Sequence, residues 1–283
     1  MMRTRKGHKV YPLTVAQKFH LYYAPHCPSM AVLNIGTSLT IEVDLDWDQL
    51  KKSINEAYAR SEGMRIRFAK DKEGNWYQYI VDPEEQDIEF VDFSDGTLEE
   101  AEAKMREWTR VPFKMQDTQM SRVVMIKMPD GFNGIYFLGQ HMTVDAQSLI
   151  CFLKDIIELY CSAKYEGVPY PKEMCSYIEQ LQKDLAYEAG SKAQQRDIAF
   201  FQKEIEKGEP IYNGIHGTDK LEAAREMFKN PELRTAFNAS DDTTSALDIF
   251  HLEEEPTKRL MDFCEKYHVS LACLLLMGLR TYY

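Results

Sequence analysis

Long apolar runs are missing from this chain. Its longest apolar stretch, Leu271 to Met277, is far shorter than the roughly 20 residues that a helix needs to cross a bilayer. No apolar core follows the basic start at Arg3 to Lys6, so nothing in the sequence resembles a signal peptide. These absences predict a cytoplasmic protein with no membrane partner.

Cysteine is scarce, and no two cysteines form a Cys-x-x-Cys motif. The chain has six, which are Cys27, Cys151, Cys161, Cys175, Cys264 and Cys273. Several fall in apolar stretches with helical spacing, where a thiol behaves as a small buried hydrophobe. We therefore expect reduced thiols in a reducing compartment rather than a disulfide framework.

Metal-ligand spacing is also absent. Zinc sites in proteins draw on three or four ligands at characteristic intervals. His141 shows no such spacing with the other six histidines, which are His8, His20, His26, His216, His251 and His268. We expect no metal ion and interpret these six as surface or loop residues.

Positive charge is in the minority. Lys and Arg number 34 against 45 Asp and Glu, which gives a net charge of −11. A nucleic-acid-binding domain would favour a basic face, so the charge balance argues against nucleic acid as a partner. Hydrophobic content of 44% is ample for a packed core, and 283 residues allow one large domain or two smaller ones.

The first half of the chain predicts an α/β order of elements. Capping-box patterns at Thr14-x-x-Gln17 and Thr97-x-x-Glu100 predict two helix starts. Apolar periodicity adds a helix over about 47–60 and strands over 31–43, 64–68, 76–81, 88–93, 122–128 and 134–138. Turn residues between the second and third strands, and between the last two, predict two hairpins.

The second half is predicted to be mostly helical. Helices are expected over 148–165, twice within 174–207, from Pro256 and from Ser270, with a polar irregular stretch over 209–242 and a strand over 246–252. Pro169 and Pro171 mark a break. We therefore predict an N-terminal lobe over residues 1–170, and connecting helices with the beginning of a second lobe over 171–283.

One short loop concentrates reactive side chains. Gln140-His141-Met142-Thr143-Val144-Asp145-Ala146 lies between an apolar run and an amphipathic one. His141 supplies an imidazole that titrates near neutral pH, and Asp145 could cap a helix, pair with a cation or orient that imidazole. Taken alone, the spacing favours a polar loop in which Asp145 or Ser148 is a helix N-cap.

This loop resembles the His-His-x-x-x-Asp-Gly motif of nonribosomal peptide synthetase condensation domains, which chloramphenicol acetyltransferase and related acyltransferases share. His141 and Asp145 match the motif, whereas Gln140 replaces its first His and Ala146 its Gly. Three more segments follow in the family's order. They are Thr14–Gln17, similar to Ser-x-Ala-Gln; Arg60–Phe68, similar to Arg-His-Glu-x-Leu-Arg-Thr-x-Phe; and Trp108–Phe113, similar to the Pro-Phe element before the motif strand.

The resemblance implies a fold and a reaction. The fold would be a chloramphenicol acetyltransferase-like two-layer sandwich with a mixed, mainly antiparallel sheet and flanking helices. The reaction would join an acyl or peptidyl thioester to an amine, with both substrates on the phosphopantetheine arms of carrier proteins and no bound cofactor or metal. His141 would be the catalytic residue, either as a general base or by positioning the amine and stabilising developing charge.

Arg65 can be interpreted in two ways. The alternation of Met64, Ile66 and Phe68 turns Arg65 to the opposite face of its predicted strand, where a basic side chain is usually solvated. The resemblance instead implies an ion pair between Arg65 and Asp145 behind the active site. A buried carboxylate would need such a cation.

The two departures from the motif bear on the substrate channel, which Gln140 and Ala146 are candidates to line. Gln140 can hydrogen-bond but carries no charge, which suits a structural role. The methyl group of Ala146 would interfere if the backbone there needed a positive φ or close approach by a pantetheine arm.

The last segment, 270–283, is apolar nearly all round, and such a helix should be buried on all sides. Members of the family have a complete second lobe, so we expect a truncated chain covered by the rest of a multidomain synthetase or by an identical chain. Two alternatives stay open. One is a stand-alone coenzyme A-dependent acyltransferase of the same superfamily, and the other is a non-catalytic scaffold or carrier-docking module.

Overall fold

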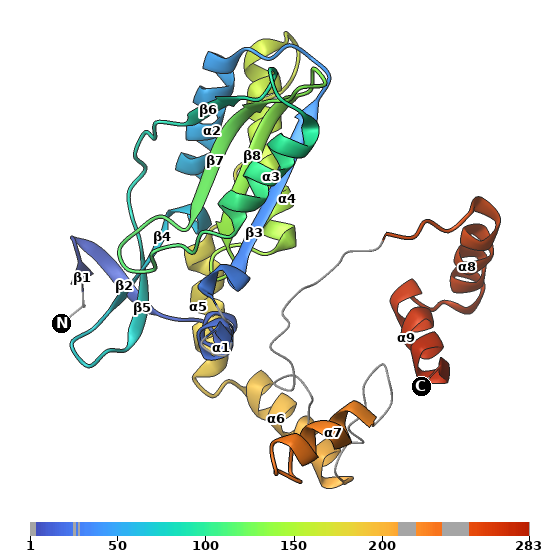
Figure 1. Cartoon of the computed structure of the whole chain (residues 1–283). Helices are drawn as coiled ribbons and strands as arrows, with labels where there is room; N and C mark the ends of the chain where they lie inside the picture. Colours follow the sequence, from blue (N-terminus) through green and yellow to red (C-terminus); the bar gives the residue numbers. More distant parts are fainter. Residues whose placement is uncertain (1–3, 25–26, 28, 209–218, 234–248, 283) are drawn as a thin grey trace. The chain divides into compact units, whose positions relative to one another are not determined.

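The computed structural model describes residues 4–24, 27, 29–208, 219–233 and 249–282 (Figure 1). The chain divides into two compact units, Met1–Arg196 and Asp197–Tyr283, and each is described by itself. Unit 1 contains both sheets and the His141 loop. The predicted lobes, 1–170 and 171–283, stay a prediction.

The larger sheet of unit 1 carries the His141 loop at the end of a central strand. Its order is β3 (Asn34–Ile41), β8 (Asn133–Gln140), β7 (Ser121–Lys127) and β6 (Glu89–Asp92). The β3–β8 and β8–β7 pairs are antiparallel, and the β7–β6 pair is parallel. The mixed, mainly antiparallel sheet is therefore confirmed.

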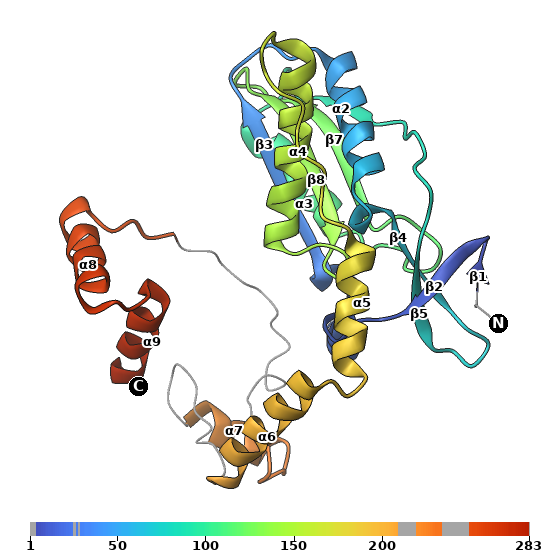
Figure 2. The same cartoon turned by 180° about the vertical axis from the view of Figure 1, so that it is seen from behind.

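Helices cover both faces of this sheet, because successive side chains on a strand point to opposite sides. α2 (Trp47–Arg60) and α4 (Ala146–Lys164) lie side by side on one face, and α3 (Leu98–Thr109) lies on the other (Figures 1 and 2). Ile135 and Phe137 of β8 pack in the core under α2 and α4, whereas Tyr136 and Leu138 pack with α3. As a result β8 is buried along its whole length.

A second, antiparallel sheet has the order β1 (Thr4–Arg5), β2 (His8–Pro12), β5 (Trp76–Ile80) and β4 (Ile66–Lys70). The predicted hairpin between β4 and β5 is confirmed, with Gly74 at a positive φ of 88° in the turn. The predicted start of β4 is wrong by two residues. Met64 and Arg65 belong to a short 3-10 turn, Gly63–Arg65, that precedes the strand.

Two helices join the second sheet to the rest of unit 1. α1 (Val15–Tyr23) begins at Thr14 with the predicted capping box, in which the Thr14 side chain accepts from the backbone N–H of Gln17. α5 (Tyr177–Glu188) packs against α1, since Lys18 forms an ion pair with Glu188 at 2.9 Å. The break at Pro169 and Pro171 therefore leads into a helix that stays with unit 1.

Unit 2 is helical in its described residues. α6 (Lys192–Glu206) crosses from unit 1 and is followed by α7 (Asp219–Met227), α8 (Glu254–Tyr267) and α9 (Leu271–Tyr282). The predicted cap of the last helix is confirmed, because the Ser270 hydroxyl accepts from the N–H of Cys273 at 3.2 Å. No described helix is long and apolar enough to cross a membrane.

Several predictions in this region are corrected. α7 is a helix within the stretch 209–242 that was expected to be irregular, and the parts 209–218 and 234–242 lie outside the described residues. Of the predicted strand 246–252, residues 249–252 are irregular and 246–248 lie outside the described part. Pro256 is the third residue of α8 rather than its first.

One expectation of burial is also wrong, and the one about the last helix stays a prediction. Leu275, Leu276 and Leu279 of α9 are each more than half exposed, and their expected cover is the rest of a synthetase or an identical chain. The six cysteines are free thiols, as expected, yet only Cys264 is buried. The others are exposed or half-buried, so apolar helical spacing was a poor guide to their surroundings.

Candidate active site

The His141 loop is held at its first two residues by backbone hydrogen bonds. The N–H of Gln140 donates to the carbonyl of Met120 at 2.8 Å, and the N–H of His141 donates to the carbonyl of Leu33 at 2.7 Å. Leu33 directly precedes β3 and Met120 directly precedes β7. The backbone at His141 is thus tied to both neighbours of β8, while its imidazole is exposed.

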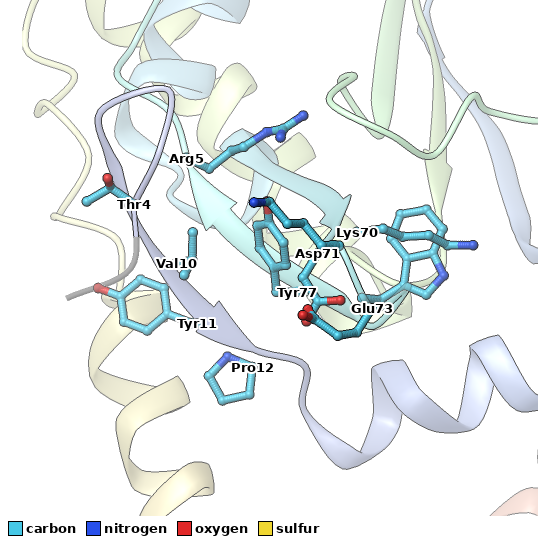
Figure 3. A pocket seen from close by; sticks show the side chains of 11 residues that line it. Thr4, Arg5, Val10, Tyr11, Pro12, Lys70, Asp71, Glu73 and Tyr77 are labelled. Carbon is cyan, nitrogen blue, oxygen red and sulfur yellow. The ribbon is translucent and has the colours of Figure 1, made fainter. Parts of the chain in front are cut away.

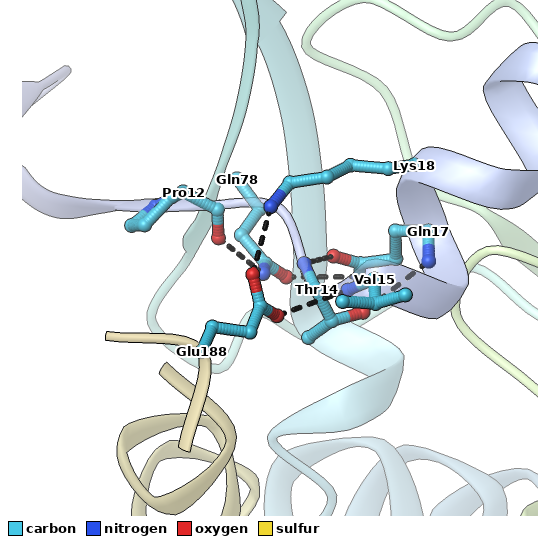
Figure 4. A network of polar contacts seen from close by, with 7 residues as sticks. All are labelled: Pro12, Thr14, Val15, Gln17, Lys18, Gln78 and Glu188. Atoms are coloured by element: carbon cyan, nitrogen blue, oxygen red, sulfur yellow. Dashed lines mark hydrogen bonds and ion pairs between the residues drawn. The ribbon is translucent and has the colours of Figure 1, made fainter. Parts of the chain in front are cut away.

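Gln17 fixes the next residue of the loop from α1. Met142 is buried in a third core with Leu13, Ile66 and Phe68, and its carbonyl accepts from Nε2 of Gln17 at 3.2 Å. The same Nε2 lies 3.0 Å from Oε1 of Gln78 on β5 (Figure 4). Gln17 therefore joins the loop to the second sheet through buried polar contacts, which are strong where every partner is satisfied.

Tyr177 on α5 completes this buried network. Its hydroxyl donates to Oε1 of Gln78 at 2.8 Å and lies 3.2 Å from Nε2 of Gln17. Glu188, at the other end of α5, accepts from Lys18 and from the N–H of Val15 (Figure 4). The first turn of α1 is therefore held at several points beside the loop.

Asp145 is the N-cap of α4. Its Oδ1 accepts from the N–H of Ser148 at 2.8 Å and from the Ser148 hydroxyl at 2.7 Å, while its own N–H donates to that hydroxyl oxygen. The pKa of the Asp145 carboxyl lies below its ordinary value, first because of the Ser148 N–H and then because of the hydroxyl, with a smaller contribution from the His141 imidazole. Asp145 thus makes the helix cap that the spacing alone favours.

Comparison with known proteins places this loop in a family. The model of the condensation domain family matches residues 7–281, which is almost the whole chain. This chain belongs to the condensation domain family. Condensation domains are acyltransferases that form amide bonds in nonribosomal peptide synthesis.

Named relatives agree with this assignment. Surfactin synthase subunit 1 of Bacillus subtilis (strain 168) is 26% identical over 205 residues, which cover 69% of this chain and 6% of that protein. A polyketide synthase-nonribosomal peptide synthetase of Aspergillus clavatus is 24% identical over 199 residues, which cover 70% of this chain and 5% of that protein. The chain therefore matches a small part of each synthetase.

Solved structures confirm the fold. The first condensation domain of the calcium-dependent antibiotic synthetase aligns with a TM-score of 0.63 and 20% identity, covering 78% of this chain and 57% of that one. The starter condensation domain of rhizomide synthetase aligns with a TM-score of 0.63 and 18% identity, covering 71% and 49%. The chain thus has the chloramphenicol acetyltransferase-like fold and spans about half the length of these solved domains.

The two departures from the condensation motif are accommodated without strain. Gln140 is only 1% exposed, and its Oε1 accepts from the N–H of Met142 at 2.6 Å. It therefore supports the loop from inside and does not line an open channel. Ala146 is exposed and begins α4 with helical backbone, so its methyl group meets no positive φ.

The predicted ion pair between Arg65 and Asp145 is not formed, which corrects that expectation. Arg65 donates to the carbonyl of Val81, and its Nε has no partner among the described residues. Burial lowers the pKa of the Arg65 guanidinium from its ordinary value. The physical reason is that Asp145 is exposed and already satisfied by Ser148, so no buried carboxylate requires a cation there.

Within the motif segment Arg60–Phe68, the residue that forms an ion pair is Arg60. Its partner is Asp155 of α4. Nε and Nη2 of Arg60 contact the two carboxylate oxygens of Asp155 at 3.0 and 3.1 Å, and the side chains are only 14% and 6% exposed. Arg60 also donates to the carbonyl of Lys172. This bidentate pair joins the end of α2 to the middle of α4, and bidentate geometry is the strong form of the contact.

Sequence reasoning missed His20. It was interpreted as a surface or loop residue, yet its ring centroid on α1 lies 4.6 Å from that of His141. The one available signal was the three-residue spacing from Gln17, which puts both side chains on one face of a helix. Among the described residues, no three His, Cys, Asp or Glu side chains cluster as a metal site would require.

A hollow of about 720 Å³ lies on the second sheet (Figure 3). Its lining includes Arg5, Lys70, Asp71, Glu73 and Tyr77, and none of the predicted site residues. The hollow is open and its charges are of both signs. We place the candidate site at His141 because an exposed imidazole on a hydrogen-bonded loop can act chemically and the loop matches the condensation motif.

Proposed function

We propose that this chain supplies the His141 side of a condensation site that joins a carrier-bound thioester to an amine. The observation that carries the proposal is an exposed imidazole on a hydrogen-bonded backbone, since His141 is tied to Leu33 and its neighbour Met142 is buried against Gln17. Positioning a reactive group in this way accelerates a reaction between two bound substrates.

The chemistry follows from the substrates. The amine nitrogen attacks the thioester carbonyl, a C–N bond forms, the C–S bond breaks, and the thiol leaves with a proton. His141 takes the proton that the amine loses, or holds the amine and stabilises its developing charge. Asp145 is occupied by Ser148 and serves as a helix cap, so we assign it a structural role in this reaction.

The partners follow from the relatives. The matched synthetases are large proteins of which this chain covers a few per cent, which supports carrier proteins and the rest of a multidomain synthetase as partners. The phosphopantetheine arm of a carrier protein would deliver each substrate, with no resident cofactor. Such partners would place the protein in the cytoplasm, where its six free thiols remain reduced.

An acyl-transfer assay with carrier-bound thioesters tests the proposal in the natural polypeptide. His141→Ala is expected to lower kcat by about 10²- to 10⁴-fold, as removal of a general base does. His8→Ala is the matched control, since His8 lies on β2 against Tyr79 and outside the loop. The control should keep the wild-type rate.

Two other outcomes have definite meanings. Equal rates for wild type and His141→Ala would overturn catalysis at His141 and favour a carrier-docking or scaffold module. Efficient transfer from a coenzyme A thioester without any carrier protein would instead favour a stand-alone acyltransferase. The carrier-docking or scaffold alternative is supported by Gln140, because this residue replaces the first His of the motif and leaves His141 as its one imidazole.

A further inference from the structure

Two imidazoles lie together at the candidate site, although the motif itself contains one. The ring centroids of His20 and His141 are 4.6 Å apart, with an angle of 33° between the ring planes. His20 is half-buried and His141 is exposed. The two residues are far apart in the sequence, so tertiary structure alone brings the rings into contact.

α1 is built to hold His20 in this place. His20 follows Gln17 by three residues, so both side chains are on one face of the helix. Gln17 bonds to the carbonyl of Met142, the residue next to His141. The face of α1 that anchors the loop is therefore the face that presents His20 to it. Gln140, buried beneath the loop, has its side chain directed to Met115 and Met142 instead.

We propose that His20 is a positioning residue for His141, whose ring limits the rotation of the His141 imidazole and shares its charge environment. This inference rests on the proposed function, because it gives His20 its role in acyl transfer. The physical basis is contact between rings, which restricts an otherwise exposed side chain and keeps its nitrogens at a fixed place above the loop.

The charges around the pair make it testable. The pKa of His20 lies below its ordinary value, first because the ring is partly buried and second because His141 repels a second proton. Asp145, at the start of α4, is a nearby carboxylate, and the His141 imidazole contributes to lowering its pKa. On α1, Lys18 is paired with Glu188 of α5. Removing the His141 imidazole should therefore remove one of the two causes that lower the pKa of His20.

Nuclear magnetic resonance on the ¹⁵N-histidine-labelled, full-length chain tests the contact without any assay of activity. His141→Gln should raise the pKa of His20, because the neighbouring charge that disfavours its protonation is removed. The labelled His8, whose ring stacks on Tyr79, serves as the reference signal. A His20 titration that does not move would overturn the pairing.

Kinetics tests the positioning role. His20→Ala should lower kcat about tenfold with little change in KM, and His20→Phe, which keeps a ring at this place, should restore most of the rate. Tryptophan fluorescence would verify that each variant is folded. Wild-type kcat in His20→Ala, beside an inactive His141→Ala, would overturn the positioning role and leave the proposed function standing. Full activity of His141→Ala would overturn both the proposed function and the positioning role of His20, whether or not the pKa of His20 changes.

Discussion

Units 1 and 2 differ in how they treat their apolar side chains. In unit 1, helices cover both faces of the larger sheet, and its buried hydrophobic residues form three cores. In the described part of unit 2, the buried hydrophobic residues are Leu221, Ala224 and Cys264, while α9 leaves its leucines exposed. The difference shows that the base of the candidate site lies in the part of the chain that covers its own core.

The same truncation in the two units should have very different effects. Phe152 of α4 is fully buried, and its ring lies 5.1 Å from that of Tyr58 and 5.8 Å from that of Phe137. Phe152→Ala is expected to lower the free energy of unfolding of unit 1 by about 4 kcal/mol, because it removes buried contacts and leaves a cavity. Leu275→Ala in α9 should change it by less than about 0.5 kcal/mol, because Leu275 is 54% exposed.

Urea unfolding followed by tryptophan fluorescence measures this contrast. The three tryptophans, Trp47, Trp76 and Trp108, all lie in unit 1, so the signal reports on that unit. Equal destabilisation by both variants would show that α9 is packed into the same cooperative structure, and the contrast between the units would then be wrong.

The buried ion pair sharpens the comparison within unit 1. Arg60→Ala is expected to cost about 3 kcal/mol, since it leaves the carboxylate of Asp155 buried without its partner. Replacing both residues at once, as Arg60→Met with Asp155→Leu, should cost much less, because no charge is then left alone. Lys104→Ala is the control, because Lys104 forms an exposed ion pair with Glu107. This substitution should lower the free energy of unfolding by about 0.5 kcal/mol or less.

Equilibrium unfolding of the single and double variants, combined in a thermodynamic cycle, checks this expectation. If Arg60→Ala proved as mild as Lys104→Ala, the pair would contribute nothing to holding α2 against α4. The end of α2 at Arg60 would then have to be held against α4 by apolar contacts alone.

The smallest effect is expected at the Asp145 cap. Asp145→Ala should lower the free energy of unfolding by about 1 kcal/mol, the usual contribution of an N-cap side chain. Because the pKa of Asp145 is lower in the folded chain, its contribution is present above the ordinary carboxyl value and is lost as the pH falls through the lowered one. The difference between wild type and variant should therefore shrink in acid.

A double-mutant cycle with Arg65→Ala decides between the cap and an ion pair. The two substitutions should be additive within about 0.5 kcal/mol, because Arg65 bonds to Val81 and Asp145 to Ser148. A coupling energy well above this value would restore the ion pair that the family resemblance implies.

Local patterns predicted much of the fold. The helix over 47–60, the capping boxes at Thr14 and Thr97 and both hairpins are confirmed, because each depends on residues that are close in sequence. The family and its fold followed from motifs in the correct order. At the candidate site, local patterns located the His141 loop and allowed for a cap at Asp145.

The errors at the candidate site concern partners that are distant in sequence. The choice of Arg65 rather than Arg60 for the ion pair depended on where α2 ends against α4, which the motif alone does not specify. His20 was missed because its partner, His141, is brought to it by the packing of α1 on the loop. Such contacts arise from tertiary structure, so sequence periodicity does not predict them.

The pairing of β3 with β8 has a consequence for synthesis on the ribosome. β3 leaves the ribosome before its partner strand, which follows roughly a hundred residues later, so at about 5–20 residues per second it waits for several seconds as an unpaired edge. A flat apolar strand would be prone to aggregate during that delay. Asn34, Thr37, Ser38 and Thr40 make this strand polar. These polar residues therefore limit aggregation of β3 before it pairs with β8, and they also fit its final position at the edge of the sheet.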